Sequence, residues 1–330
     1  MKSEENNILV SIVIPVYGVE KYIERCASSL FEQTYSNIEF VFVDDCTPDA
    51  SIAKMNTILE RYPQRKANVN VIKNISNCGL AAVRNIGVKH CHGQFLMHVD
   101  SDDWLDKNVV KYCIEQQKKE NADIVIFDRK FHYKKNIQTI IVKEQENKEQ
   151  ILIQMLKRER EVSIWGMLIR TTLYTSHNIK CVEGVNMSED YQTSPRLVYF
   201  AKCITFAHGI YYNYECRNTK SISSSFTAKN VKQELVTLNV LLSFFSNKEE
   251  IFKQASDYGI AKQLCYFRHN AAYFKLDKLY TELSNMVKQI NETTISTLPL
   301  PYRIGLHIHQ AFLLRWYVGI LKKLKTINIQ

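Results

Sequence analysis

The chain has 330 residues and a mass of 38.5 kDa, which is enough for one large domain or for a catalytic domain with a smaller one beside it. Hydrophobic residues make up 45% of the chain and charged residues 23%, with 10 Gly and 6 Pro, which excludes collagen-like, low-complexity and wholly disordered proteins. The net charge of +9 favours anionic partners such as nucleotides, phospholipid head groups or nucleic acid.

The cysteines and the first residues bear on the compartment. Nine cysteines are spread singly, never as Cys-x-x-Cys, and their odd number argues against a closed disulfide framework. Residues 1–7 are polar, and the run that follows them reads as a strand rather than as the apolar core of a secretory signal. We therefore expect a cytoplasmic protein.

Short β-branched runs alternate with helical patterns from the start of the chain. Ile8–Pro15 is a nearly continuous apolar run, typical of a strand that is buried on both faces of a parallel sheet. Further strands are predicted at 40–43, 69–73, 94–99 and 124–128, with helices between them at 22–31, 51–61, 80–89 and 109–121. This alternation predicts an α/β domain in which a mostly parallel sheet is flanked by helices.

The rest of the chain is less regular. The pattern predicts an edge hairpin or insertion at 130–148 and a helix at 190–202. Two short strands, at 203–206 and 210–214, are predicted to close the domain. Beyond Ala228 the pattern is helical throughout, so a boundary is expected near Phe226. We predict an α/β domain over 1–226 and a helical C-terminal domain over 227–330.

Polar and acidic side chains follow the ends of three predicted strands. Because the carboxyl ends of parallel strands meet at one edge of a sheet, these loops are the first candidates for a site. They hold Pro15 and Tyr17, then Asp44 and Asp45, then Asp100, Ser101, Asp102 and Asp103. Clustered carboxylates repel one another unless a cation balances their negative charge. Mg²⁺ and Mn²⁺ prefer oxygen ligands, including those of substrate phosphates. We predict a metal–diphosphate site at 100–103, over the alternative that this segment only caps the next helix.

Two further features leave alternatives open. Asp44 and Asp45 either close a turn after the second strand or place one carboxylate on the N–H of a nucleotide base. The segment from Asn77 through Gly79 opens a helix with small residues, which permits close approach of backbone or ligand, and it sets Arg84 one turn inside. Arg84 either reaches a phosphate or an acidic loop, or forms an ordinary salt bridge between helices.

Four sequence blocks stand in a fixed order between residues 15 and 104: PVYGVEKYIERCASSLFEQTY, VFVDDCTPD, NCGLAAVRNIG and VDSDDW. This order resembles the family-2 glycosyltransferases, whose nucleotide-sugar-binding domain has the GT-A fold. A weaker resemblance extends to about residue 225 through SIWGMLIRTTLY, MSEDYQTSPRLVYFAKCITF and YYNYECRNTKSISSS. The chain departs from the family at Gly18, where Asn is common, at Cys46-Thr47-Pro48, where Gly-Ser-Thr is common, and at Ser188, where Gly usually precedes the acidic pair.

The resemblance implies a role for each matching residue. It places Pro15 and Tyr17 at the base pocket, Asp45 or Asp44 on the base, and Asp100, Asp102 and Asp103 around ribose, diphosphate and metal. The acidic pair Glu189-Asp190 would supply the catalytic base, with Asp190 as the preferred residue, although two acids at a helix N-terminus also stabilise the helix. Arg217 or Lys220, on a late loop, is expected to help neutralise the departing diphosphate.

The resemblance implies a metal-dependent, inverting glycosyltransferase with Mn²⁺ or Mg²⁺. The donor would be a nucleotide-diphosphate sugar, preferably a UDP-sugar, and the acceptor a hydroxyl of a saccharide or lipid-linked saccharide in the synthesis of a surface polysaccharide such as capsule or lipopolysaccharide. The alternatives are a non-catalytic nucleotide- or glycan-binding module with the same fold and a nucleotidyltransferase, whose Gly-rich phosphate loop PVYGVEKY does not match. No nucleic acid is expected as a partner. The sugar, the acceptor and the oligomeric state stay open.

The C-terminal segment is basic and amphipathic. No Asp or Glu follows Glu292, and apolar residues recur every four positions from Ile308 to Leu324 with Lys and Arg between them. This pattern predicts a helix over 304–325 that either makes peripheral contact with the inner face of the cell membrane or packs on the helical domain. It is too short and too charged to span a membrane.

Overall fold

The computed structural model describes residues 8–142, 147–218 and 226–324. The polar start at 1–7, the end of the weaker resemblance at 219–225, which includes Lys220, and residue 325 of the predicted tail helix lie outside these ranges. The chain divides into two compact units, 1–148 with 163–221 and 149–162 with 222–330. The boundary near Phe226 stays a prediction, to which the structure adds that 149–162 belongs with the C-terminal helices.

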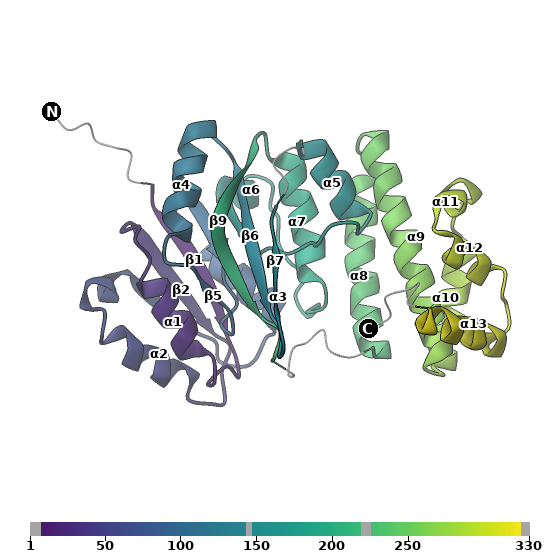
Figure 1. Cartoon of the computed structure of the whole chain (residues 1–330), viewed down its shortest axis with the longest axis horizontal. Helices are drawn as coiled ribbons and strands as arrows, with labels where there is room; N and C mark the ends of the chain where they lie inside the picture. The colour runs from purple at the N-terminus through teal and green to yellow at the C-terminus, as the bar shows by residue number, and fades with distance from the viewer. Residues whose placement is uncertain (1–7, 143–146, 219–225, 325–330) are drawn as a thin grey trace. The chain divides into compact units, whose positions relative to one another are not determined.

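The first unit is built on one mixed sheet, which has nine strands among the described residues (Figure 1). The strands are β1 (Val10–Val16), β2 (Ile38–Asp44), β3 (Val69–Lys73), β4 (Phe95–His98), β5 (Trp104–Leu105), β6 (Ile124–His132), β7 (Ile137–Ile140), β8 (Met167–Arg170) and β9 (Ile204–Glu215). Their order is β3-β2-β1-β4-β8-β6-β9-β5, with β7 paired to β6. The pairs from β3 to β4 are parallel, whereas β8 runs antiparallel to both of its neighbours.

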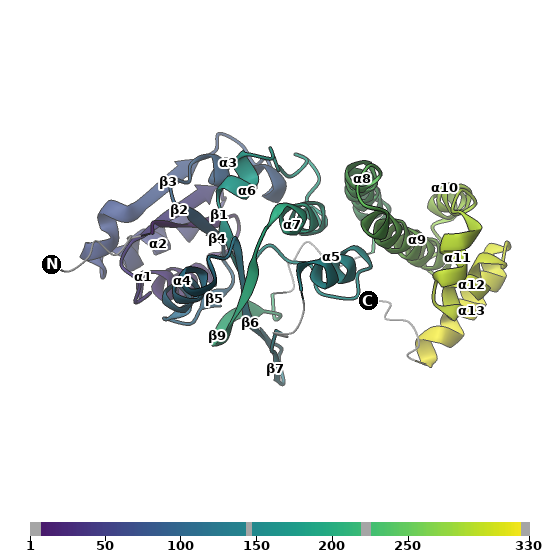
Figure 2. The same cartoon turned by 90° about the horizontal axis from the view of Figure 1, so that it is seen from above.

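Helices cover both faces of this sheet (Figure 2). They are α1 (Ile23–Phe31), α2 (Ser51–Leu59), the 3₁₀ helix η1 (Pro63–Asn68), α3 (Leu80–Lys89), α4 (Val109–Glu120), α6 (Thr172–Thr175) and α7 (Glu189–Phe200). The apolar side chains of α1, α2 and α4 join the strands in one large core on one face. On the other face, Val83 of α3 packs against Val41 and Val43 of β2. Both faces of the central strands are therefore buried, as their continuous apolar runs predict.

The strands and helices predicted up to residue 128 are all present, with small differences at their ends. The edge hairpin predicted within 130–148 is formed by β6 and β7. The prediction of two strands at 203–206 and 210–214 was wrong, because both belong to the single strand β9. A register shift in the pairing with β6 carries β9 past Gly209, and the carboxylate of Asp128 accepts the Gly209 N–H at 3.0 Å, which replaces the lost ladder bond.

The second unit is helical. Its described helices are α5 (Lys148–Leu156), α8 (Ala228–Phe245), α9 (Glu250–Tyr273), α10 (Asp277–Val287), α11 (Glu292–Thr297), α12 (Leu300–Leu306) and α13 (Ala311–Lys323). The long helix α9 packs against α8 and against each of the helices from α10 to α13. None of the helices in the described ranges is long and apolar enough to cross a membrane.

The prediction of one continuous helix over 304–325 was wrong, because α12 ends at Leu306 and α13 begins at Ala311. A buried arginine of helix α9 stabilises the interruption between α12 and α13. The buried Arg268 donates hydrogen bonds to the carbonyl oxygens of Gly305 at 2.9 Å and Ile308 at 2.6 Å, so a side chain satisfies these carbonyls where the helix is interrupted. A Cβ on Gly305 of α12 would lie 1.9 Å from the Nε2 atom of His269 of α9, so only glycine lets α12 approach α9 this closely.

Candidate functional site

Helix α3 lies directly on strand β1, and this close packing sets the position of the site. A Cβ on Gly87 would lie 2.2 Å from the Cγ1 atom of Val13, so the glycine allows the helix axis to approach the sheet. One turn earlier on α3, Arg84 is consequently pressed against the carboxyl ends of the parallel strands. Its side chain is only 2% exposed.

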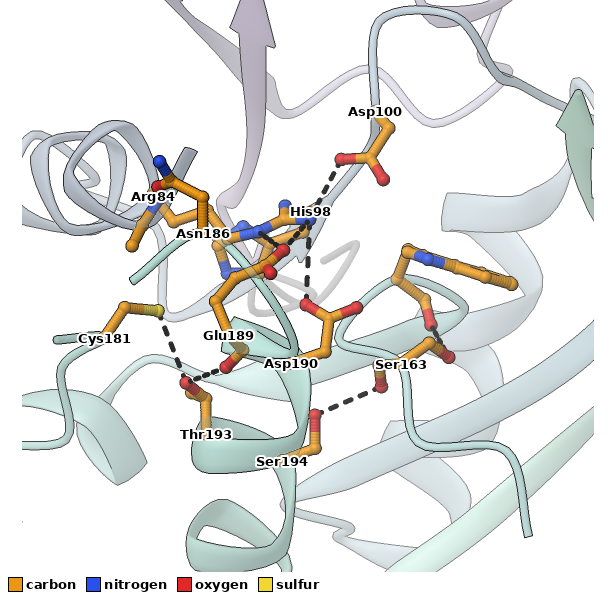
Figure 3. Close-up of polar contacts among 12 residues, drawn as sticks. Arg84, His98, Asp100, Ser163, Cys181, Asn186, Glu189, Asp190, Thr193 and Ser194 are labelled. Carbon is orange, nitrogen blue, oxygen red and sulfur yellow. Dashed lines mark hydrogen bonds and ion pairs between the residues drawn. The ribbon is translucent and has the colours of Figure 1, made fainter. Parts of the chain in front are cut away.

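Arg84 is the shared cation of an acidic cluster (Figure 3). Its Nη2 atom lies 3.0 Å from Asp100 Oδ1, 3.3 Å from Glu189 Oε1 and 3.7 Å from Asp190 Oδ1. Burial alone would lower the pKa of Arg84, but these carboxylates raise it well above its ordinary value. One positive charge thus faces three carboxylates, which leaves an excess of negative charge at this edge of the sheet.

The acidic pair opens helix α7 in a buried setting. Burial raises the pKa of Glu189 although Arg84 opposes it, and burial together with the charge of Glu189 raises the pKa of Asp190 well above its ordinary value. Among the described residues, Asp190 Oδ1 has no hydrogen-bond partner. A carboxylate with a raised pKa and an unused oxygen is suited to accept a proton.

The loop before α7 is attached to α3, which holds the acidic pair against Arg84. The backbone N–H of Ala81 donates to Asn186 Oδ1 at 3.1 Å, so this side chain caps the first turn of α3. Asn85 of α3 forms a reciprocal pair with the backbone of Cys181, donating to its carbonyl and accepting from its N–H, both at 2.9 Å. A Cβ on Gly79 would lie 2.4 Å from the Asn186 amide, so this position too needs glycine.

The two aspartates after β2 have different partners. Asp44 Oδ1 accepts the N–H of Thr47 at 2.8 Å, the turn contact that was one of its two predicted roles. The carboxylate of Asp45 accepts the N–H groups of Cys78 and Gly79, each at 2.9 Å, and the Asn74 side chain also donates to it. Although burial raises the pKa of Asp45, these donors lower it, so the carboxylate is ionised and fixes the loop before α3.

The segment after β4 separates into carboxylates that face the site and one that does not. Asp102 Oδ2 accepts the side-chain N–H of Asn218 at 2.8 Å, and burial together with Asp100 raises the pKa of Asp102. Asp103 is fully buried, and its two oxygens accept the hydroxyl of Tyr212 and the N–H of Glu215, each at 2.7 Å.

Both oxygens of Asp103 thus accept hydrogen bonds from strand β9, so Asp100 and Asp102 are the better candidates to hold a metal. Ser101, between them, is buried. The described residues hold no group of three or more His, Cys, Asp or Glu side chains disposed around one metal position. A Mg²⁺ or Mn²⁺ ion that takes one or two carboxylates and completes its shell with substrate phosphates does not require such a group. The surplus of carboxylates over Arg84 fits a divalent cation at Asp100 and Asp102.

The remaining predicted donor residues lie around this edge. Pro15 is buried at the end of β1, whereas Tyr17 is 51% exposed and Asn77 is exposed. The guanidinium of Arg217 forms a bidentate pair with Glu215. Sequence reasoning missed Glu215, whose pKa falls to about 2 despite its burial because Arg217 and a second arginine, Arg25, both bind it.

Arg25 is a second residue that the sequence did not reveal. Its guanidinium lies 3.6 Å from the centre of the Trp104 ring, 2.9 Å from Glu215 and 2.8 Å from the carbonyl oxygen of Asp102. No local pattern could have found it, because the three partners are more than 70 positions away along the chain.

The three departures from the family pattern share one backbone property. Gly18, Cys46 and Ser188 all have positive φ, at 67°, 57° and 57°. The residue types that are common in the family at these positions, Asn and Gly, are the ones that tolerate the left-handed conformation. The chain therefore keeps the loop geometry at Cys46 and Ser188 with residues that adopt it at some cost.

The comparisons with known proteins agree with this architecture. Residues 11–171 match the family model described as Glycosyl transferase family 2. The chain is 32% identical over 191 residues to the uncharacterized glycosyltransferase EpsJ of Bacillus subtilis, which covers 55% of this chain and 54% of that protein. It spans about half the length of the curated relatives it matches.

Two solved structures share the fold. The crystal structure of Staphylococcus aureus TarS 1–349 in complex with UDP-GlcNAc superposes with a TM-score of 0.75 at 20% identity, covering 97% of this chain and 92% of that chain. The mannosyltransferase PcManGT from Pyrobaculum calidifontis in complex with GDP-Man and Mn²⁺ gives a TM-score of 0.54 at 12% identity, covering 97% and 88%. The predicted GT-A fold with a helical C-terminal region is confirmed. Through residues 11–171, the chain belongs to glycosyltransferase family 2.

Proposed function

We propose that this chain transfers a glycosyl group from a nucleotide-diphosphate sugar, preferably a UDP-sugar, to a hydroxyl of a saccharide or lipid-linked acceptor in the synthesis of a surface polysaccharide. The observation that carries the proposal is the acidic cluster around Arg84, where the loop after β4 meets the first turn of α7. The UDP-GlcNAc bound by TarS supports the choice of donor.

Asp190 is the proposed catalytic base. Its carboxylate removes the proton of the acceptor hydroxyl, and the acceptor oxygen attacks the anomeric carbon from the side opposite the nucleoside diphosphate. The bond from that carbon to the diphosphate oxygen breaks, and its electron pair leaves with the diphosphate, so the configuration inverts. The raised pKa of Asp190 makes its ionised form a better proton acceptor than an ordinary aspartate.

Donor binding is assigned to the loops at the same edge. Tyr17, Asp45 and the loop that Asp45 fixes surround the base, while Asp100 and Asp102 face the ribose and the diphosphate. Asp100 and Asp102 would also hold Mn²⁺ or Mg²⁺, which when bound neutralises charge on the leaving diphosphate. The Mn²⁺ in the PcManGT complex supports a metal of this kind. Arg217 lies in an exposed position beside Glu215, from which its charge can reach the diphosphate.

A thermal-shift and turnover experiment tests the proposal. Wild type, Asp102→Ala and Asp190→Asn are each heated with UDP-, GDP- and dTDP-sugars, with and without Mn²⁺, and transfer of the sugar to water is measured alongside. We expect one nucleotide class to stabilise wild type and Asp190→Asn but not Asp102→Ala, and turnover in wild type and in the control below but in neither of these two variants. Asp257→Asn, in the helical unit, is the matched control. Stabilisation of wild type by a nucleotide sugar without any turnover would favour the non-catalytic binding module.

The exposed face of the tail supports peripheral contact with an anionic membrane. Helix α13 packs through Leu314, Val318 and Leu321, while Phe312 and Trp316 are 62% and 71% exposed. No Asp or Glu follows Glu292 in the sequence, so the charged side chains of α13 are all basic. Two of its cations are engaged within the unit, because Arg315 and Lys322 contact α9. We propose that the two aromatic rings enter the head-group region of an anionic lipid surface.

Vesicle flotation tests this contact with the full chain. Wild type and the double variant Phe312→Ser/Trp316→Ser are mixed with phosphatidylglycerol-containing vesicles and with neutral phosphatidylcholine vesicles. The control, Tyr112→Ser/Ile137→Ser, removes two exposed apolar side chains from the other unit. We expect wild type and control to float with the anionic vesicles and the tail variant to stay behind. Equal flotation of all three proteins would contradict the assignment.

A further inference from the structure

Arg84 lies inside the acidic cluster and not at an exposed surface of the site. Its side chain is almost wholly buried, and its Nη2 atom is surrounded by the carboxylates of Asp100, Glu189 and Asp190. The carboxylates engage Nε and Nη2, and the remaining nitrogen, Nη1, is buried, so the guanidinium presents no exposed nitrogen to a diphosphate. We propose that Arg84 is a positioning residue, which ties the donor-side Asp100 to the acceptor-side pair Glu189-Asp190 and does not bind the donor. This inference rests on the proposed function.

The three carboxylates come from two segments that are far apart in the sequence. Asp100 lies in the loop after β4, whereas Glu189 and Asp190 lie in the first turn of α7. The position of Arg84 is itself fixed by the sheet, because Gly87 lets α3 pack directly on β1. Its planar fork meets Glu189 Oε1 through both Nε and Nη2, each at 3.3 Å, while Nη2 also reaches Asp100. One rigid side chain therefore sets the spacing between the donor-side aspartate and the proposed base.

Two buried atoms of this ion-pair network are still available for hydrogen bonds. Within the described ranges, neither Arg84 Nη1 nor Asp190 Oδ1 has a hydrogen-bond partner, although both atoms are buried. Asp190 Oδ1 is already 3.7 Å from Arg84 Nη2. The neighbouring His98 is paired elsewhere, because its Nε2 atom lies 3.1 Å from the hydroxyl oxygen of Tyr174. If Asp100 held a divalent cation, the guanidinium of Arg84 would remain close enough to Asp190 to orient its carboxylate.

A split between binding and turnover tests this role. Arg84→Lys keeps the charge but loses the fork, and Arg84→Gln loses both. We expect the Kd of UDP with Mn²⁺, measured by calorimetry, to stay within about fivefold of wild type in both variants. Sugar transfer to water should fall about 100-fold in Arg84→Gln, as expected when the base is misplaced, and less in Arg84→Lys.

The matched control is Arg65→Lys. Arg65 is also buried, but its guanidinium donates to main-chain carbonyl oxygens, those of Phe31, Gln33, Tyr35 and Ser36. Its replacement should lower the melting temperature and leave the turnover of the folded protein unchanged. If the Arg84 variants, like this control, have a lower melting temperature but unchanged turnover of the folded protein, Arg84 is merely structural and the inference is overturned.

Two further outcomes separate the inference from the proposed function. If Arg84→Gln loses UDP binding as completely as Asp102→Ala does, Arg84 is a donor ligand and the inference fails while the proposed function stands. If wild type binds no nucleotide with or without Mn²⁺, the proposed function is wrong, and the inference, which depends on it, is wrong as well. Should Arg84→Gln not fold, Glu189→Gln replaces it, because it weakens the same network from the acceptor side. It is expected to give the same split, and unchanged turnover would overturn the inference.

Discussion

The contact between α3 and β1 predicts the outcome of one small substitution in detail. In Gly87→Ala, the added methyl carbon would lie 2.2 Å from Val13 Cγ1, whereas carbon atoms pack at about 3.5 Å or more, so helix or strand must move by roughly 1 Å. Overpacking of this kind costs about 1–3 kcal/mol, and the gain in helix propensity offsets about 1 kcal/mol of it. We expect a net loss of up to about 2 kcal/mol in the free energy of unfolding.

Gly319→Ala provides the matched comparison. Gly319 also lies inside a helix, α13, but a Cβ there would meet no atom within 4 Å. This variant should be more stable than wild type by up to about 1 kcal/mol, since it keeps the propensity gain without the clash. Urea denaturation followed by circular dichroism measures both.

The activity of Gly87→Ala should fall as well, because a displacement of α3 by roughly 1 Å moves Arg84 relative to the acidic pair, and misplacements of this size cost about 100-fold in rate. Equal stability of the two alanine variants would refute the argument that α3 packs this tightly on β1.

The other predictions concern strain and pH. Replacing Ser188, which has a φ of 57°, by glycine should raise the free energy of unfolding by about 1 kcal/mol and leave UDP binding intact, and a lower melting temperature would contradict this. Burial lowers the pKa of His269 to about 4, so the helical unit should be fully stable above pH 6.5 and lose stability as the pH falls from about 6.5 toward 4, an effect that urea midpoints would show and that His269→Gln should reduce. Glu215→Gln should lower the melting temperature at pH 7, and this difference should shrink as the pH falls from about 4.5 toward 2, because the pKa of Glu215 is held at about 2 by Arg217 and Arg25.

The elements of the first unit could largely be predicted because their signals are local. The run Val10–Val16 and the helical spacing of 80–89 each lie within one short window of sequence. Strand β8 carries no such signal, since Met167–Arg170 is four residues long and is defined by the two antiparallel neighbours that it meets. The break between α12 and α13 also depends on a distant residue, the buried Arg268.

The same distinction holds for the site. The acidic loops after β2 and β4 stand out because they follow buried strands directly. Asn186 and Asn218 could not be found in this way, because their partners, Ala81 and Asp102, are more than 100 positions away and an isolated asparagine in a loop has many ordinary roles. Nor does the sequence indicate that both oxygens of Asp103 serve β9, since the neighbouring aspartates look identical to it locally.

The ion pair between Arg84 and Glu189 spans 105 positions of the chain and has a consequence for how the protein is made. During synthesis, β1, α3 and β4 emerge well before α7, so Arg84 can reach Asp100 long before its later partners exist. A nascent chain at this stage holds the donor loops without the proposed base. Because contacts of such long range form late in folding, the pairing of Arg84 with α7 should be among the last native contacts to form. Donor binding without transfer would then mark a chain that has folded only in part.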